Sequence, residues 1–99
     1  MAYSIIWSPL SRDDLRGIVR FIALDSPDRA AAFGYRLIAR ADQLQQFPES
    51  GRKVPEHDNP MIRELVLTPY RIIYRVDHER QFVEIVRVWH GARGTPKVS

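Results

Sequence analysis

The stretch "YRIIYRVDHERQFVEIVRVWH", residues 70–90, decides the fold. Two runs rich in β-branched and aromatic residues, 71–77 and 82–89, flank the polar residues 78–80, which is typical of two antiparallel strands joined by a turn. Side chains alternate between the two faces of a strand. The first run therefore has one set that can meet a core, Tyr70, Ile72, Tyr74 and Val76, and a second set on the opposite face, Arg71, Ile73 and Arg75.

The length of the turn sets how the two strands pair. A turn with an odd number of residues places Arg71 opposite Arg87 and Ile73 opposite Ile85, which gathers Arg71, Arg75 and Arg87 on one open face, whereas an even turn scatters them. Like charges opposite each other destabilise a sheet, so this face is expected to be solvated or to meet an anion. The structural alternative is that these arginines are edge charges that prevent aggregation.

Two serine–proline pairs upstream of this stretch predict the starts of two helices. Ser8-Pro9 and Ser26-Pro27 each combine a residue that caps a helix N-terminus with a proline that fits the first turn, and apolar residues follow each pair at helical spacing. The second helix is expected to end near Phe47-Pro48, and Gly34 would allow the two helices to approach closely.

The remaining elements complete an α+β domain. Residues 3–7 and 62–67 are predicted strands, and residues 49–60 a loop rich in Pro, Gly and charge. We expect an N-terminal strand, a two-helix antiparallel hairpin and a three-stranded antiparallel meander, which form one sheet with the helices on one face.

Composition limits what such a chain can be. Its 99 residues, 44% of them hydrophobic, fit a single domain over residues 1–99. It has no cysteine, and His57 beside Asp58 is no metal-ligand spacing, so we expect neither a cofactor nor a metal site. The absence of cysteine suits a reducing cytoplasm. The N-terminus has neither a basic leader nor a long apolar run, so we expect a soluble protein that does not enter the membrane. The net charge of +3 suits a nucleic acid or an acidic protein partner.

Several phrases, in this order, resemble the RelE/ParE superfamily of toxins from bacterial toxin–antitoxin systems. They are "IIWSPLSRDDLRGIVRFIALDSP" (5–27), "FPESGRKVPE" (47–56), "RELVLTPYRIIYRV" (63–76) and "VEIVRVWHGARG" (83–94). The ending is most similar to the ParE and plasmid-stabilisation branch. The resemblance implies a small toxin that a cognate antitoxin neutralises. It also implies one of two activities, because ParE-like members poison DNA gyrase and RelE-like members cut mRNA in the ribosome, and a shared fold does not choose between them.

Cleavage of RNA would require an acid–base group and cations at the phosphate. His90 would be the acid or base, with Arg71, Arg87 and Arg93 at the phosphate, and Glu49 or Glu56 is a possible base. Two departures from the RNase members count against this. Gly91 stands where they tend to carry an aromatic residue that stacks on a base, and Lys53 and Lys97 are the sole lysines.

Poisoning of gyrase needs a binding surface and no catalytic residue in the toxin. Such a surface is offered by the predicted basic face with the C-terminal arginine: Arg71, Arg75, Arg87 and Arg93. This hypothesis ranks first, the ribosome-dependent mRNA endonuclease second, and a relic that merely binds its antitoxin third. For single residues the structural alternatives are that His90 bonds a neighbouring backbone group, that Arg93 is a charge on a flexible tail, and that Trp89 packs in the core. The antitoxin is expected to cover a groove with an amphipathic helix or an added strand.

Overall fold

The computed structural model describes residues 2–97 and confirms the α+β class. In chain order its elements are β1 (Ser4–Trp7), α1 (Pro9–Ala23), α2 (Pro27–Asp42), the 3-10 helix η1 (Gln43–Gln45), β2 (Arg52–Lys53), β3 (Ile62–Leu67), β4 (Tyr70–Asp77), β5 (Phe82–His90) and the 3-10 helix η2 (Gly91–Arg93).

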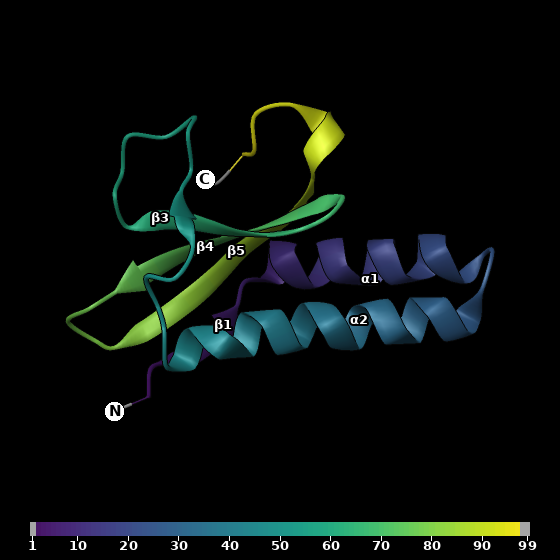
Figure 1. The fold of residues 1–99 in the computed structure, drawn as a ribbon, viewed down its shortest axis with the longest axis horizontal. Helices are drawn as coiled ribbons and strands as arrows, with labels where there is room; N and C mark the ends of the chain where they lie inside the picture. Colours follow the sequence, from purple (N-terminus) through teal and green to yellow (C-terminus); the bar gives the residue numbers. More distant parts are fainter. Residues whose placement is uncertain (1, 98–99) are drawn as a thin grey trace.

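The five strands form one sheet in the order β1-β5-β4-β3-β2. β1 pairs with β5 in parallel, and the other neighbours are antiparallel. Helices α1 and α2 lie side by side against one face, and the loop between β2 and β3 lies with the C-terminal segment on the other side of the sheet (Figure 1). The short strand β2 at one edge was not predicted, because its two residues are both charged and lie within a stretch of loop composition.

Both helices begin where the serine–proline pairs predicted. The Ser8 side chain accepts a hydrogen bond from the Ser11 backbone N–H, the Ser26 side chain accepts one from Arg29, and a proline occupies the first turn of each helix. A Cβ on Gly34 would lie 3.3 Å from a methyl carbon of Val19 in α1, so the predicted close approach of the helices is confirmed.

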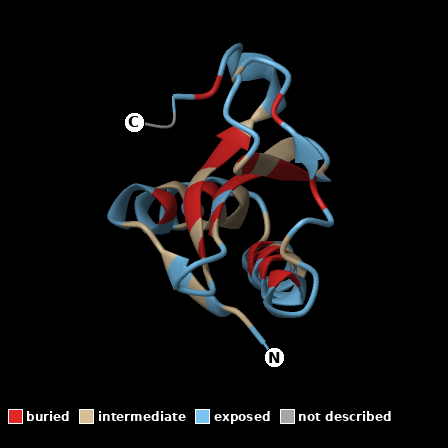
Figure 2. Cartoon of the chain, turned by 90° about the vertical axis from the view of Figure 1, so that its left-hand side faces the viewer, coloured by how far each residue is buried: buried red, intermediate tan, exposed pale blue. Residues whose placement is uncertain are grey.

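The main core fills the space between the helices and the sheet. Figure 2 shows the buried residues concentrated on the strands and on part of the helical surface. The buried members of this core are Ile18, Leu37, Ala41, Leu44, Leu65, Ile72, Tyr74, Val76, Val83, Ile85 and Val88. They include the set predicted from β4, whose Tyr70 packs at the margin of the core.

The opposite face of the sheet is not open, contrary to expectation. A second apolar cluster covers part of it, because Val54 from the loop packs on Ile62, Ile73 and Trp89. The C-terminal segment folds over the same region, where the Trp89 indole N–H donates to the Gly94 carbonyl at 3.1 Å and Pro96 is buried. A loop and a tail therefore provide this face with a small core of its own.

The strand register also differs from the expected one. Asp77 pairs with Phe82, which leaves an even turn of residues 78–81, and Arg71 lies opposite Trp89 rather than Arg87. A bulge at Val86 compensates for the even turn, since Tyr74 pairs with Ile85 and Ile73 pairs with Arg87. Arg87 and Trp89 are thereby returned to the face of β4 that carries Arg71.

Neither helix within residues 2–97 is long and apolar enough to cross a membrane.

Candidate functional site

Trp89 forms the centre of the predicted basic face. Its side chain is 2% exposed, and the guanidinium carbons of Arg87 and Arg93 lie 5.0 and 4.0 Å from the centre of its rings. Both arginines therefore make cation–π contacts with one buried indole. Trp89 is a packing residue, as its structural alternative predicted, and Arg93 is held against it rather than standing on a free tail.

Arg71 is bound by two carboxylates. Its two terminal nitrogens donate to the Glu56 oxygens at 2.8 and 3.1 Å, and its Nε donates to Glu64 at 2.5 Å. The hydrogen bonds that Glu56 accepts from Arg71 hold the pKa of Glu56 below its ordinary value and raise the pKa of Arg71. Glu64 is 1% exposed and also accepts from Arg52 Nε at 2.5 Å, so its buried charge has two cationic partners.

Arg87 and Arg75 are paired as well. Arg87 donates to both oxygens of Asp14 in α1, at 2.8 and 2.9 Å, and the Val88 backbone N–H donates to the same carboxylate at 3.0 Å. The hydrogen bonds that Arg87 donates to Asp14 raise the pKa of Arg87. Arg75 forms an ion pair with Glu84 on the neighbouring strand. Of the four arginines predicted for this surface, Arg93 alone makes no ion pair within residues 2–97.

His90 lies apart from Arg71. The two side chains point to opposite faces of the sheet, because Tyr70 pairs with His90 and Arg71 pairs with Trp89. His90 Nδ1 accepts the Ala92 backbone N–H at 3.0 Å, and its ring lies edge-on to Tyr70 with centroids 5.2 Å apart. The predicted alternative for His90, a strand-end histidine that bonds the backbone, therefore describes its geometry.

The structure does not assemble the predicted RNA-cleaving set. His90 and Arg93 line one groove of about 460 Å³, with Tyr70 and Asp14. The two carboxylates considered as bases are both ion-paired. Glu56 pairs with Arg71, and a Glu49 carboxylate oxygen lies 3.4 Å from a guanidinium nitrogen of Arg63. The groove therefore brings His90 and Arg93 together, whereas Arg71 and Arg87 lie outside it and are ion-paired with carboxylates.

Sequence reasoning missed the acidic partners of the arginines. Asp14 lies on the same helical stripe as Ile18 and Ile22, and a carboxylate on an apolar stripe indicates a buried cation nearby. Glu64 shares one face of its strand with Ile62 and gives the same signal. In both cases the sequence pattern indicates the buried carboxylate, but it does not identify the arginine that pairs with it.

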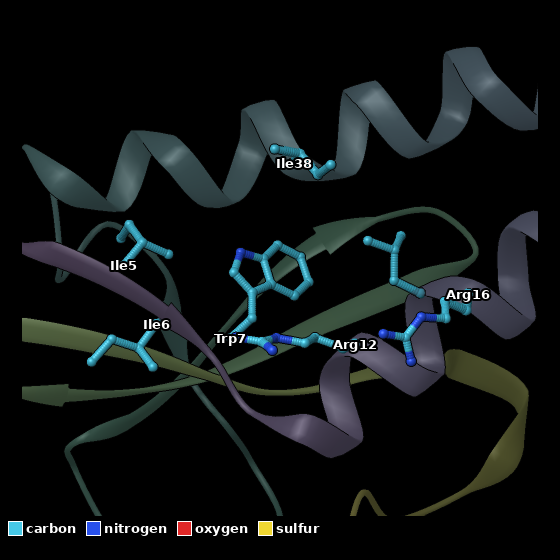
Figure 3. Close-up of a pocket in the computed structure, with 7 residues that line it drawn as sticks. Ile5, Ile6, Trp7, Arg12, Arg16 and Ile38 are labelled. Atoms are coloured by element: carbon cyan, nitrogen blue, oxygen red, sulfur yellow. The ribbon is translucent and has the colours of Figure 1, made fainter.

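A second groove, here called the β1 groove, follows the free edge of the sheet and has a volume of about 550 Å³. β1 pairs with β5 on one side and, among residues 2–97, with no strand on the other, and Ile6 is 45% exposed. Figure 3 shows Trp7 pointing from β1 toward α2, while Arg12 and Arg16 come from α1. The groove is lined by Ile5, Ile6, Trp7, Arg12, Leu15, Arg16 and Ile38. This combination suits an apolar chain segment that carries negative charge.

Comparison with known proteins covers nearly the whole chain. Residues 5–94 match the family model described as the ParE toxin of the type II toxin–antitoxin system parDE. The chain is 37% identical over 90 residues to Toxin RelE2 of Caulobacter vibrioides, covering 90% of this chain and 96% of that protein. It is 35% identical to the putative toxin Y4kP of Sinorhizobium fredii, over 95% and 94% of the two chains.

Two solved structures share the fold at lower sequence identity. The chromosomal ParDE system of P. aeruginosa superimposes with a TM-score of 0.73 at 24% identity, covering 90% of this chain and 96% of that one. A mutant of the E. coli toxin RelE in the free state gives a TM-score of 0.71 at 16% identity, covering 95% and 88%. Structures with both names therefore share this arrangement of helices and strands.

Proposed function

Because the chain belongs to the ParE toxin family of type II toxin–antitoxin systems, we propose that it arrests bacterial growth by poisoning DNA gyrase in the cytoplasm until a cognate antitoxin neutralises it. As a type II toxin of the ParE/RelE superfamily it has two candidate targets, gyrase and the translating ribosome.

The observation that supports gyrase is the neutralisation of the sheet arginines. Arg71, Arg75 and Arg87 are each paired with a carboxylate, so an incoming phosphate would have to displace Glu56, Glu84 or Asp14. An RNase must stabilise negative charge at the phosphate, and paired arginines serve this poorly. A protein that acts by binding its target has no such requirement.

Supercoiling by purified gyrase tests the proposal. Toxin in excess should block supercoiling of relaxed plasmid, or leave linear DNA when gyrase is removed with detergent and protease. Toxin mixed beforehand with its antitoxin is the control. If supercoiling proceeds normally and no breaks accumulate at toxin excess, gyrase is not the target.

Ribosome-dependent mRNA cleavage remains the second candidate, because His90 and Arg93 share a groove and relatives of this chain are named RelE. His90→Asn separates the two activities. Asparagine can still accept the Ala92 backbone N–H, since it is a good helix-capping residue, but it cannot act as an acid or base. Loss of cleavage within codons, measured by primer extension on a translated message, would support this candidate. An unchanged inhibition of gyrase by the same variant would support the first.

We propose the β1 groove as the binding site of the antitoxin. A strand edge gives a peptide its backbone hydrogen bonds, the apolar lining receives its alternate side chains, and Arg12 makes no ion pair within residues 2–97. An acidic, partly apolar antitoxin segment would complement all three features.

A further inference from the structure

The overhanging end of the helical hairpin forms a further groove, here called the aromatic groove, of about 510 Å³. It lies where α1 and α2 extend beyond the sheet and meet the turn between β3 and β4 (Figure 1). Its lining residues are Phe21, Ile22, Arg29, Ala32, Phe33, Arg36, Pro69, Tyr70 and His90. It shares none of them with the β1 groove.

The floor of the aromatic groove is built from packed rings. Tyr70 contacts Phe33 at 5.4 Å and His90 at 5.2 Å between ring centroids, in tilted and edge-on geometries. Phe21 stands on the rim with 71% of its surface exposed. The rings in the floor are held by their neighbours, so the groove is preformed, and a partner would gain apolar contact at Phe21 without reordering the toxin.

The charge of the groove is positive. Arg29 and Arg36 are its charged lining residues, and no carboxylate of the described part of the chain lines it. Arg29 pairs with Asp25, whereas the Arg36 guanidinium lies 5.9 Å from the centre of the Phe33 ring and makes no ion pair within residues 2–97. Arg36 is thus the cation that remains available to a partner, and it stands directly beside an apolar floor.

The shape and lining favour a protein over a nucleic acid. Bases bind by stacking on open aromatic faces, but Phe33 and Tyr70 are half-buried and already contact each other. Ile22, Ala32 and Pro69 add aliphatic walls, which suit an apolar side chain. The aromatic groove therefore resembles the pockets that receive a single anchor residue in a protein interface.

We propose that the aromatic groove binds an acidic, apolar segment of gyrase, with an anchor side chain against Phe21 and Tyr70 and a carboxylate on Arg36. This inference rests on the proposed gyrase function and assigns it a contact surface. Since the aromatic groove and the β1 groove have no residue in common, an antitoxin segment in the β1 groove leaves Phe21 and Arg36 uncovered. The affinities for gyrase and for the antitoxin are then separable by mutation.

A double variant, Phe21→Ala with Arg36→Glu, tests the assignment. Both side chains are exposed, so the fold should persist, which circular dichroism and thermal melting would verify. The control is Tyr35→Ala with Arg80→Glu, which likewise removes an exposed ring and reverses one charge but lies outside the groove. The groove variant should bind purified gyrase at least about tenfold more weakly than wild type, while the control binds as wild type does. Antitoxin affinity should be unchanged in both.

Four results would overturn the assignment. Wild-type inhibition of gyrase by the groove variant shows that the target binds elsewhere, and leaves the proposed function intact. An equal loss of antitoxin affinity makes the groove part of the antitoxin site instead. Binding of wild-type toxin, but not the groove variant, to DNA alone makes it a nucleic-acid site. A wild-type toxin that leaves gyrase active removes the proposed function, and this inference with it.

Discussion

Gly51 has no room for a side chain. A Cβ there would lie 2.5 Å from the Glu64 carbonyl oxygen and 2.5 Å from the Tyr74 hydroxyl, which accepts the Gly51 backbone N–H at 2.9 Å. Gly51→Ala should therefore lower the free energy of unfolding by about 1–3 kcal/mol. Urea denaturation followed by circular dichroism would measure the change.

Gly17 provides the matched control for Gly51. A Cβ at this position in α1 meets nothing within 4 Å, so Gly17→Ala should raise the free energy of unfolding by about 0.5–1 kcal/mol through helix propensity alone. Equal effects of the two substitutions would contradict the close contact at Gly51.

Glu56 should make stability depend on pH. Arg71 lowers its pKa in the folded state below the unfolded value of 4.5, so its contribution is present above pH 4.5 and is lost as the pH falls through the folded pKa. Glu56→Gln should therefore be less stable than wild type at neutral pH, and the difference should shrink below pH 4.5. Urea midpoints across this range would show it. Glu79→Gln, at an exposed turn residue, is the control, and a difference that persists undiminished in acid would refute the ion pair as its cause.

The N-cap of α1 also ties the helix to the sheet. The Ser8 hydroxyl accepts the Ser11 N–H at 3.0 Å and donates to the Val86 carbonyl at 2.9 Å, whereas the Ser26 side chain caps α2 by its bond from Arg29. Ser8→Ala should cost about 1–2 kcal/mol of stability and Ser26→Ala about 0.5–1 kcal/mol. Thermal melting of both variants would give the order, and a larger loss at Ser26 would contradict it.

Local signals predicted the elements well and their lateral contacts less well. Serine–proline pairs and apolar spacing placed both helices, because caps and amphipathic stripes are encoded within a few residues. The bulge at Val86 was not predicted, because the sequence does not show which of the two adjacent aliphatic residues, Ile85 and Val86, stays out of the strand pairing. The neutralisation of the basic face was not predicted either, because Arg87 and Asp14 are 73 positions apart in the sequence and local patterns do not show that they are in contact.

At the scale of the whole molecule, two arginines that make no ion pair among the described residues lie away from the sheet face that the sequence suggested. Arg12 in the β1 groove and Arg36 in the aromatic groove make no ion pair within residues 2–97, while the arginines on β4 and those flanking Trp89 are engaged by carboxylates or by the indole.

Arg12→Glu should weaken the antitoxin complex by about tenfold or more and reduce its sensitivity to salt, because it replaces an attraction with a repulsion in a partly desolvated groove. Arg80→Glu, which changes the net charge equally in a turn, separates the local effect from the global one. Calorimetric titration at two salt concentrations would measure both variants. Equal losses in the two would mean that overall charge, rather than the β1 groove, attracts the antitoxin.

The parallel pairing of β1 with β5 determines when β1 can pair during synthesis of the protein. Ser4 lies opposite Phe82, and β5 also carries the ladder to β4, so the strand that joins the two halves of the sheet is made last. During translation, the emerging polypeptide holds its first strand unpaired until residue 90 has left the ribosome. A chain released before that point leaves the edges of β1 and β4 unpaired, and such exposed edges are templates for pairing with strands of other chains.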